Sequence, residues 1–220
     1  MFNTTVSISA DKNVPMGIIT DIKEQLRHAR ALKVRDKTND SAIEGSAIEK
    51  RLPPALQPDS PVVVVDALSN VDRRNVIVVR VNPKGEMFMG STYVIGSLHN
   101  EAFYIKEIER LKGIIANTTD DTKNPEIELK DILMPDGSTR QFRVSKGMVS
   151  FQCDRGTSYE DYTKAMKLIT SAYKELREEF SSEVFGKPLA ELSDAEMQAI
   201  YQAVPMNVSE VKPKDVPARK

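Results

Sequence analysis

Few side chains in this sequence stand out, by type and position, as candidates for proton transfer, nucleophilic attack or metal binding, and most of them lie far apart in the chain. They are two histidines, the single cysteine and two aspartates: His28, His99, Cys153, Asp11 and Asp154. A thiol activated by an imidazole and a carboxylate can act as a nucleophile. One hypothesis is therefore a small enzyme whose site assembles from Cys153, His99 and a distant carboxylate, and an unchanged phenotype for Cys153→Ser would exclude it.

Each of these residues also has a structural interpretation, which we favour. His28 and His99 lie on the polar sides of the helices expected around them. Cys153 alternates onto the apolar face of a strand, as a buried structural thiol does. Asp11 and Asp154 end strands directly before a turn, where aspartate commonly bonds to local backbone groups. Since the motifs of phosphate-binding loops, dinucleotide sites, zinc proteases and serine hydrolases are also missing, we expect no catalytic residue, no cofactor and no metal site.

The composition excludes several classes of partner. The chain has 220 residues, with 31 basic and 32 acidic side chains and a formal net charge of -1. Binding to nucleic acid or to an anionic membrane surface normally requires a basic excess, so neither is expected. One cysteine excludes an internal disulfide and a cysteine-based structural metal site. The longest apolar run, Val62–Val65, is far shorter than the roughly 18 residues of a membrane-spanning helix. Residues 1–14 lack the features of a signal peptide, which by itself predicts a soluble chain that is not exported.

The elements that would position these residues are centred on one strand and one helix, within residues 146–180. The strand places Val149, Phe151 and Cys153 on one side. The helix carries large apolar residues at intervals of four and three, which form one stripe: Tyr162, Met166, Ile169, Tyr173, Leu176 and Phe180. Ser158, with Asp161 three residues later, predicts a capping box at the helix start. The stripe must be buried, so we expect this helix to lie across a sheet.

The amino end of the chain is a smaller version of this unit. Residues 5–12 alternate as a strand, Pro15 stands where the first turn of a helix tolerates it, and residues 31–35 return as a strand. The helix between them is expected to bury Ile18, Ile19, Ile22, Leu26 and Ala29. Val6–Lys12 and Val149–Arg155 share the pattern Val-Ser-x-x-x-Asp-basic, which indicates an internal repeat.

The remaining elements predict an α+β fold, a mixed β-sheet with amphipathic helices packed on one face. A linker is expected over residues 37–56 because it contains a tandem Ser-Ala-Ile-Glu and two prolines. Beyond it, strands are expected at 62–67, 75–81, 86–89, 126–130, 141–144 and 207–211, with a turn at 134–137. Two further amphipathic helices are expected. The first should bury Leu98, Ala102, Ile105, Ile108 and Ile115. The second, capped by Ser193 and Glu196, should bury Ile200, Tyr201 and Val204.

Two sets of segments resemble the ExbD/TolR family of biopolymer transport proteins. Residues 6–11, 16–23 and 31–34 are similar to the C-terminal strand, helix and strand of its domain. Other segments resemble a second, longer variety of the family: Arg51–Pro54, Arg74–Asn82, Ser145–Tyr159 and Pro205–Asp215. The most specific part is the run from Gly147 to Ser158. The resemblance divides the chain into residues 1–36, a linker at 37–56, a larger domain at 57–212 and a mobile tail at 213–220.

The resemblance implies a function without a catalytic centre. Family members are anchored in the bacterial inner membrane by one N-terminal helix and project a periplasmic domain that acts as a dimer with a multi-helix partner, ExbB or TolQ. The assembly converts proton flow into force on TonB or TolA, and the TolR branch can engage peptidoglycan. The family's proton-handling aspartate lies in the membrane helix. Since this sequence has no such helix, neither Asp11 nor Asp154 is its counterpart.

We therefore expect an accessory, non-catalytic periplasmic module of a transport system driven by the proton-motive force. It would act as a homodimer or paralogue dimer and bind a TonB- or TolA-like partner. The alternative is a peptidoglycan- or ligand-binding periplasmic module without a transduction role. The chain would be the periplasmic part of one family protein, or two family segments joined, with the membrane helix missing near residues 37–50. The copied strand and helix would then pair with the second segment's sheet and imitate a family dimer.

Overall fold

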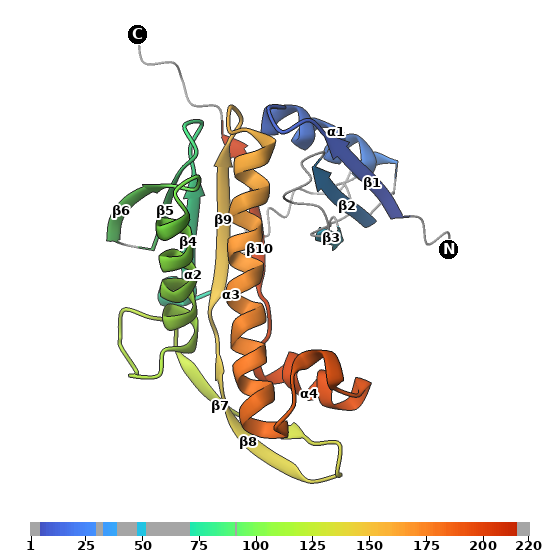
Figure 1. The fold of residues 1–220 in the computed structure, drawn as a ribbon, viewed down its shortest axis with the longest axis vertical. Helices are drawn as coiled ribbons and strands as arrows, with labels where there is room; N and C mark the ends of the chain where they lie inside the picture. Colours follow the sequence, from blue (N-terminus) through green and yellow to red (C-terminus); the bar gives the residue numbers. More distant parts are fainter. Residues whose placement is uncertain (1–4, 30–32, 39–47, 52–70, 91, 215–220) are drawn as a thin grey trace, which may run out of the picture.

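A five-stranded mixed sheet covered by two long helices forms the centre of the fold, and the amino-terminal unit packs beside it (Figure 1). The structure is a computed structural model that describes residues 5–29, 33–38, 48–51, 71–90 and 92–214. The elements are β1 (Thr5–Ala10), α1 (Met16–His28), β2 (Lys33–Thr38), β3 (Ile48–Arg51), η2 (Arg73–Asn75), β4 (Val76–Val81), β5 (Glu86–Met89), β6 (Thr92–Ser97), α2 (Glu101–Ala116), β7 (Ile127–Leu133), β8 (Thr139–Ser145), β9 (Met148–Asp154), α3 (Tyr159–Phe185), η3 (Leu189–Glu191), α4 (Asp194–Ala203) and β10 (Val208–Lys214). The fold is α+β, as predicted.

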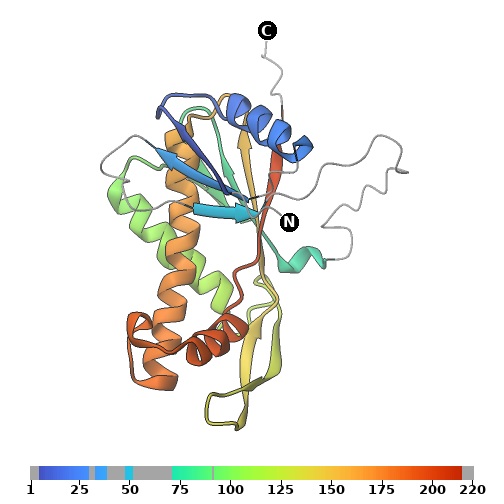
Figure 2. The ribbon, with the colours of Figure 1, turned by 90° about the vertical axis from the view of Figure 1, so that its right-hand side faces the viewer.

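The large sheet has the strand order β10-β9-β4-β5-β6. β9 lies between β10 and β4 and is parallel to both, while β4, β5 and β6 form an antiparallel meander. α2 and α3 pack side by side on one face of this sheet (Figure 2), which confirms the predicted arrangement of layers. The prediction missed β6, although its Thr-Tyr-Val-Ile sequence favours a strand.

α3 is fixed at both ends by local chemistry. Ser158 Oγ accepts the backbone N–H of Asp161 at 3.1 Å, and Gly186 ends the helix in the left-handed conformation with φ 66°. The predicted stripe faces the interior, with Tyr162, Met166, Ile169 and Tyr173 buried and Leu176 and Phe180 partly buried. Burial of six such side chains contributes on the order of 10 kcal/mol before chain entropy is subtracted.

The face that α1 buries agrees with the prediction only at Ile19 and Leu26. Its covered residues are Met16, Ile19, Lys23 and Leu26. Ile18 and Ile22 were predicted to face inward but are 53% and 42% exposed, and Ala29 is also exposed. Successive helical residues are about 100° apart, so Ile18 and Ile19 begin two different stripes. Contacts with α3 and β9 bury the Ile19 stripe, which contains a lysine that hydrophobic periodicity does not select.

The inward face of α2 was predicted only in part. Ile108 and Ile115 are buried, and so is Leu111 between them; Leu98 is buried but precedes the helix. The residues that were predicted inward but are exposed are Ala102 and Ile105. The stripe continues back from Ile108 to Tyr104, four residues earlier, and this places Ile105 outside it.

The far end of α3 carries a second, smaller core. The hairpin of β7 and β8 turns at residues 134–137 as predicted, with Gly137 at φ 81°. The ring of Phe142 in β8 meets that of Phe180 edge-on at 5.1 Å between centroids. Ala199 and Ala203 of α4 close this core.

Tyr201 of α4 was predicted to face inward and is exposed instead. The guanidinium of Arg177 lies over its ring, 4.6 Å from the centroid, and donates through Nε and Nη2 to the carbonyl oxygen of Val204 at 3.1 and 3.0 Å. The aromatic face is thus covered by a cation rather than by the core. Ile200 is buried and Val204 partly buried, as predicted.

The capping box at the start of α4 should make the stability of the fold depend on pH. Ser193 Oγ accepts the Glu196 N–H, and Glu196 Oε2 accepts the Ser193 N–H at 2.8 Å. Hydrogen bonds from Ser193 and then the Lys187 ammonium lower the pKa of Glu196 from 4.5 to about 2. A lowered pKa stabilises the fold above the ordinary value, and this stabilisation is lost as the pH falls from 4.5 to about 2. Thermal unfolding followed by circular dichroism should therefore show a steeper acid loss for wild type than for Glu196→Gln; equal slopes would contradict this.

Some expected boundaries differ or lie outside the described residues. β3 falls inside the expected linker at 37–56 and pairs antiparallel with β2. β10 extends to Lys214, two residues into the expected tail. The strand expected at 62–67 and residues 215–220 lie outside the described residues. Of the helices in the described ranges, none has the length and apolar character needed to cross a lipid bilayer.

Candidate functional site: the junction between the two copies

The two strand-and-helix copies correspond residue by residue. Val6 of β1 corresponds to Val149 of β9, and Met16, the first residue of α1, corresponds to Tyr159, the first residue of α3; the difference is 143 positions in each case. β1 is parallel to β2 as β9 is parallel to β10. The predicted internal repeat is therefore also a repeat of strand, turn, helix and parallel strand.

The copies meet through their strand-to-helix turns. Pro15 and Ser158, which are equivalent positions, form an antiparallel bridge. Backbone hydrogen bonds flank it in equivalent pairs: Met16 N–H to Thr157 O and Tyr159 N–H to Val14 O, each 2.8 Å, then Gly17 N–H to Arg155 O and Glu160 N–H to Lys12 O, each 2.9 Å. Reciprocal contacts between equivalent residues are those of a twofold axis. The junction is thus a pseudo-twofold contact within one chain.

The expected pairing of the copied strand with the large sheet is wrong. β1 pairs with β2, and β2 pairs with β3, in a three-stranded sheet of their own. β1 cannot pair with β9, because β9 is already hydrogen-bonded to β10 on one side and to β4 on the other. The copies therefore associate through the turns and not through a shared ladder.

An ion pair orients the two turns. Arg155 donates from Nη1 and Nη2 to the two carboxylate oxygens of Asp21 in α1, at 3.2 and 2.9 Å. A Cβ at Gly17 would lie 3.2 Å from this guanidinium, so glycine lets the arginine approach the helix backbone. Both side chains are more than a third exposed, so the ion pair contributes at most about 1 kcal/mol to the stability of the fold. Its main effect is to fix the orientation of the two turns.

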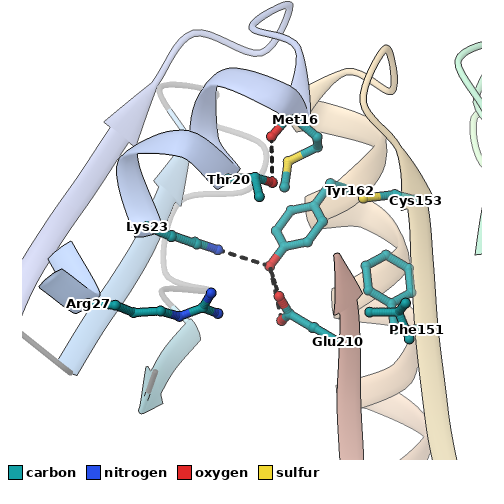
Figure 3. A pocket seen from close by; sticks show the side chains of 9 residues that line it. Met16, Thr20, Lys23, Arg27, Phe151, Cys153, Tyr162 and Glu210 are labelled. Carbon is teal, nitrogen blue, oxygen red and sulfur yellow. Dashed lines mark hydrogen bonds between the residues drawn. The ribbon is translucent and has the colours of Figure 1, made fainter. Parts of the chain in front are cut away.

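A cavity of about 40 Å³ lies behind the turns, between α1, α3 and the strands β9 and β10 (Figure 3). The buried Lys23 donates from Nζ to the hydroxyl of Tyr162 at 3.2 Å, and this hydroxyl donates to the carboxylate of Glu210 at 3.1 and 3.2 Å. Lys23 Nζ also lies 5.0 Å from the centre of the Tyr162 ring. A buried ammonium needs such partners. Tyr162 therefore links the first copy to the last strand of the second.

The structure does not bring Cys153 and His99 together. Cys153 is buried, as predicted, and lines the cavity. His99 is not among the residues that line this cavity. His99 does not lie on the polar side of a helix, because α2 begins two residues after it. His28 is the last residue of α1, and its side chain lies outside what the structure describes.

The two strand-ending aspartates shape the turns. Asp11 Oδ1 accepts the backbone N–H of Asn13 at 2.9 Å, which confirms the predicted local bond. Asp154 acts through its backbone instead, since its carbonyl oxygen accepts the Thr157 N–H at 3.0 Å and its N–H donates to Thr157 Oγ1 at 3.2 Å. The equivalent bond in the first copy runs from Val14 N–H to Asp11 O at 3.1 Å. Each aspartate therefore stabilises the strand-to-helix turn of its own copy.

His99 is part of a polar cluster at the start of α3. Lys164 Nζ lies 2.8 Å from His99 Nδ1, and because an ammonium only donates, Nδ1 accepts and Nε2 carries the ring proton. His99 Nε2 is 2.8 Å from Oδ1 of the buried Asp161, a contact that is electrostatic, since this oxygen receives no well-aligned hydrogen bond. Asp161 Oδ2 accepts the Ser158 hydroxyl at 2.7 Å. The cluster joins the starts of α2 and α3.

Gly85, in the turn between β4 and β5, lies against this cluster, and a substitution there tests how closely the turn packs on Asp161. It has φ 69°, and a Cβ there would lie 2.8 Å from Asp161 Oδ1. Gly137 has φ 81° with no atom near its Cβ position, so it reports the backbone strain alone. Strain of this kind costs about 1 to 3 kcal/mol. Urea denaturation should show a larger loss of unfolding free energy for Gly85→Ala than for Gly137→Ala, and equal losses would exclude the contact.

The residues of the candidate site that the sequence interpretation missed are polar. Tyr162 was selected for its ring, while its hydroxyl and the partners Lys23 and Glu210 were not. Asp21 was not connected to Arg155 either. The shift of 143 residues that aligns the two strands also aligns the two turns, but the alignment alone does not show that the turns are in contact.

The chain matches no family model, no curated protein and no solved structure. Within the described ranges, no three His, Cys, Asp or Glu side chains are grouped so that they could hold a metal ion. The junction is therefore the candidate site on its geometry alone.

Proposed function

We propose that this chain is an accessory, non-catalytic module of the ExbD/TolR kind in an energy-transduction system driven by the proton-motive force. The pseudo-twofold junction carries the proposal, since two units that resemble the family meet through reciprocal backbone bonds at Pro15 and Ser158. A homodimer or a paralogue dimer has this symmetry between its subunits. The module acts by pairing like units and by holding a partner.

The proposed partners are an ExbB- or TolQ-like membrane protein and a TonB- or TolA-like periplasmic protein, at the periplasmic side of a bacterial inner membrane. β10 and β6 are the edge strands of the large sheet among the strands described. An extended segment of a partner can add to such an edge through backbone hydrogen bonds. This mode of binding needs no deep pocket.

The alternative is a ligand-binding module without a transduction role. The junction cavity measures about 40 Å³, whereas sites for small molecules are roughly 300 to 1,000 Å³, so this cavity by itself does not favour the alternative. The alternative could instead bind peptidoglycan over an open surface, and the experiment below distinguishes this from the proposed function.

The test is a titration of the full chain with a TonB-like periplasmic segment, together with light scattering of the chain alone at high concentration. We expect saturable binding or self-association, and a scrambled segment of the same composition is the control. A flat result in both measurements would contradict the proposal. Retention on peptidoglycan in a pull-down without the membrane partner, combined with that flat result, would favour the alternative.

A further inference from the structure

The hairpin of β7 and β8 extends from the end of the large sheet and forms a two-stranded sheet of its own (Figure 1). Among the strands that the structure describes, β8 is the sole partner of β7. The four consecutive residues of β7 from Glu128 to Asp131 are exposed. Leu129 and Leu133 are 65% and 64% exposed, which is unusual for leucine in a strand. The surface of β7 that faces away from β8 is therefore open.

The backbone groups on this open side belong to the odd-numbered residues of β7. Lys146 N–H donates to Glu126 O at 2.9 Å, and Met134 N–H donates to Ser138 O at 2.8 Å. Hydrogen-bonded and non-hydrogen-bonded positions alternate along an antiparallel pair, so the even-numbered residues of β7 bond to β8. The residues whose N–H and C=O point away from β8 are Ile127, Leu129, Asp131 and Leu133.

We propose that two copies of this chain pair through this edge, with β7 antiparallel to β7 of the second copy and Leu129 opposite its own equivalent. A pair of identical strands in this arrangement is related by a twofold axis. The axis through Leu129 places Glu128 opposite Lys130 of the second copy, and Lys130 opposite Glu128. Opposite charges at facing positions stabilise a strand pair. The two hairpins then form one four-stranded sheet.

Charge selects this register over its neighbours. Centring the pair on Glu128, Lys130 or Asp131 would place that charge directly opposite itself, which is destabilising. A register centred between two residues would set outward backbone groups against inward ones, so no ladder could form. Of the four residues in the exposed run, Leu129 is thus the one that can lie on the axis.

The pairing would satisfy edge backbone groups and cover the exposed side chain of Leu129. It joins whole chains and is separate from the junction at Pro15 and Ser158, which lies within one chain. It rests on the self-association named in the proposed function and gives that association a surface and a register.

Exchange of charges tests the register. Light scattering of the full chain over a concentration series should show a monomer–dimer equilibrium. Lys130→Glu should raise the dissociation constant about tenfold or more, because it replaces two opposite-charge pairs with two like-charge pairs. Glu128→Lys/Lys130→Glu should restore association, since it exchanges the partners. Lys174→Glu makes the same change in net charge at an exposed site of α3 and should leave the dissociation constant unchanged.

Cysteine substitution locates the axis. Leu129→Cys should form an intermolecular disulfide on oxidation, because facing Cα atoms at a hydrogen-bonded position are about 5.5 Å apart. Leu133→Cys is the control, since it is equally exposed in the same strand but would lie about 27 Å from its equivalent. Cys153 is buried and does not compete.

A chain that remains monomeric at high concentration would overturn the proposal, as would a dimer that is insensitive to Lys130→Glu. Equal linking of Leu129→Cys and Leu133→Cys would contradict the register. A monomeric chain that still binds the TonB-like segment saturably would exclude this pairing and leave the proposed function standing, so the two failures are distinguishable.

Discussion

Replacing Ile169 with alanine should lower the free energy of unfolding by about 2 to 5 kcal/mol. Ile169 is fully buried at the middle of the α3 stripe, in the larger of the two hydrophobic clusters found among the described residues. Removal of its outer carbons leaves a cavity that the flanking Tyr162, Met166 and Tyr173 fill only in part. The loss can be measured by urea denaturation followed by circular dichroism.

The matched control is Lys174→Ala, five residues along the same helix and exposed. A surface substitution of this kind should change the unfolding free energy by about 0.5 kcal/mol or less. Similar losses for the two variants would show that α3 does not lie across the sheet with the Ile169 side inward.

Replacing Ile19 with alanine should cost a similar amount, about 2 to 5 kcal/mol, while Ile18→Ala should be nearly neutral. The two residues are neighbours of the same type, but Ile19 is 1% exposed and packs in the main core, whereas Ile18 is 53% exposed. Because Ile19 belongs to the amino-terminal unit, hydrogen exchange should report the loss first in α1 and β1. A larger loss for Ile18→Ala than for Ile19→Ala would contradict the buried face that the structure gives to α1.

The central unit could be predicted from sequence because local signals and burial agree there. The apolar stripe from Tyr162 to Phe180, the cap at Ser158 and the alternation of Val149, Phe151 and Cys153 all specify one strand and one helix. The capping box of α4 and the turn at residues 134–137 were equally local. Such elements can be read from a single stretch of sequence.

The details that failed depend on neighbours rather than on the helix itself. α1 has two apolar stripes, one starting at Ile18 and one at Ile19, and only the packing of α3 and β9 decides which is buried. The pairing of β1 with β2 could be expected from their order in the chain, but the contact between the turns at Pro15 and Ser158 joins residues 143 positions apart. Single-sequence periodicity contains no information about such long-range contacts.

The candidate site was beyond the sequence interpretation for a chemical reason. The Lys23–Tyr162–Glu210 chain places two charged groups and a hydroxyl around a cavity. A lysine on an apolar face is ordinarily assigned to solvent, since its burial costs free energy unless partners are present. Those partners come from α3 and β10, so they can be identified only once the fold is known.

A designed disulfide across the junction tests the pseudo-twofold contact most directly. Pro15 and Ser158 form an antiparallel pair flanked by reciprocal hydrogen bonds, for which a Cα separation of about 4.5 Å is typical and permits a disulfide. The Pro15→Cys/Ser158→Cys variant, oxidised when dilute, should form an intramolecular disulfide, identified by mass spectrometry of the linked tryptic peptides. The control Ala29→Cys/Ser158→Cys, with Ala29 at the other end of α1 about 20 Å away, should not. Free thiols or only intermolecular links in the first variant, or equal linking in both, would contradict the junction.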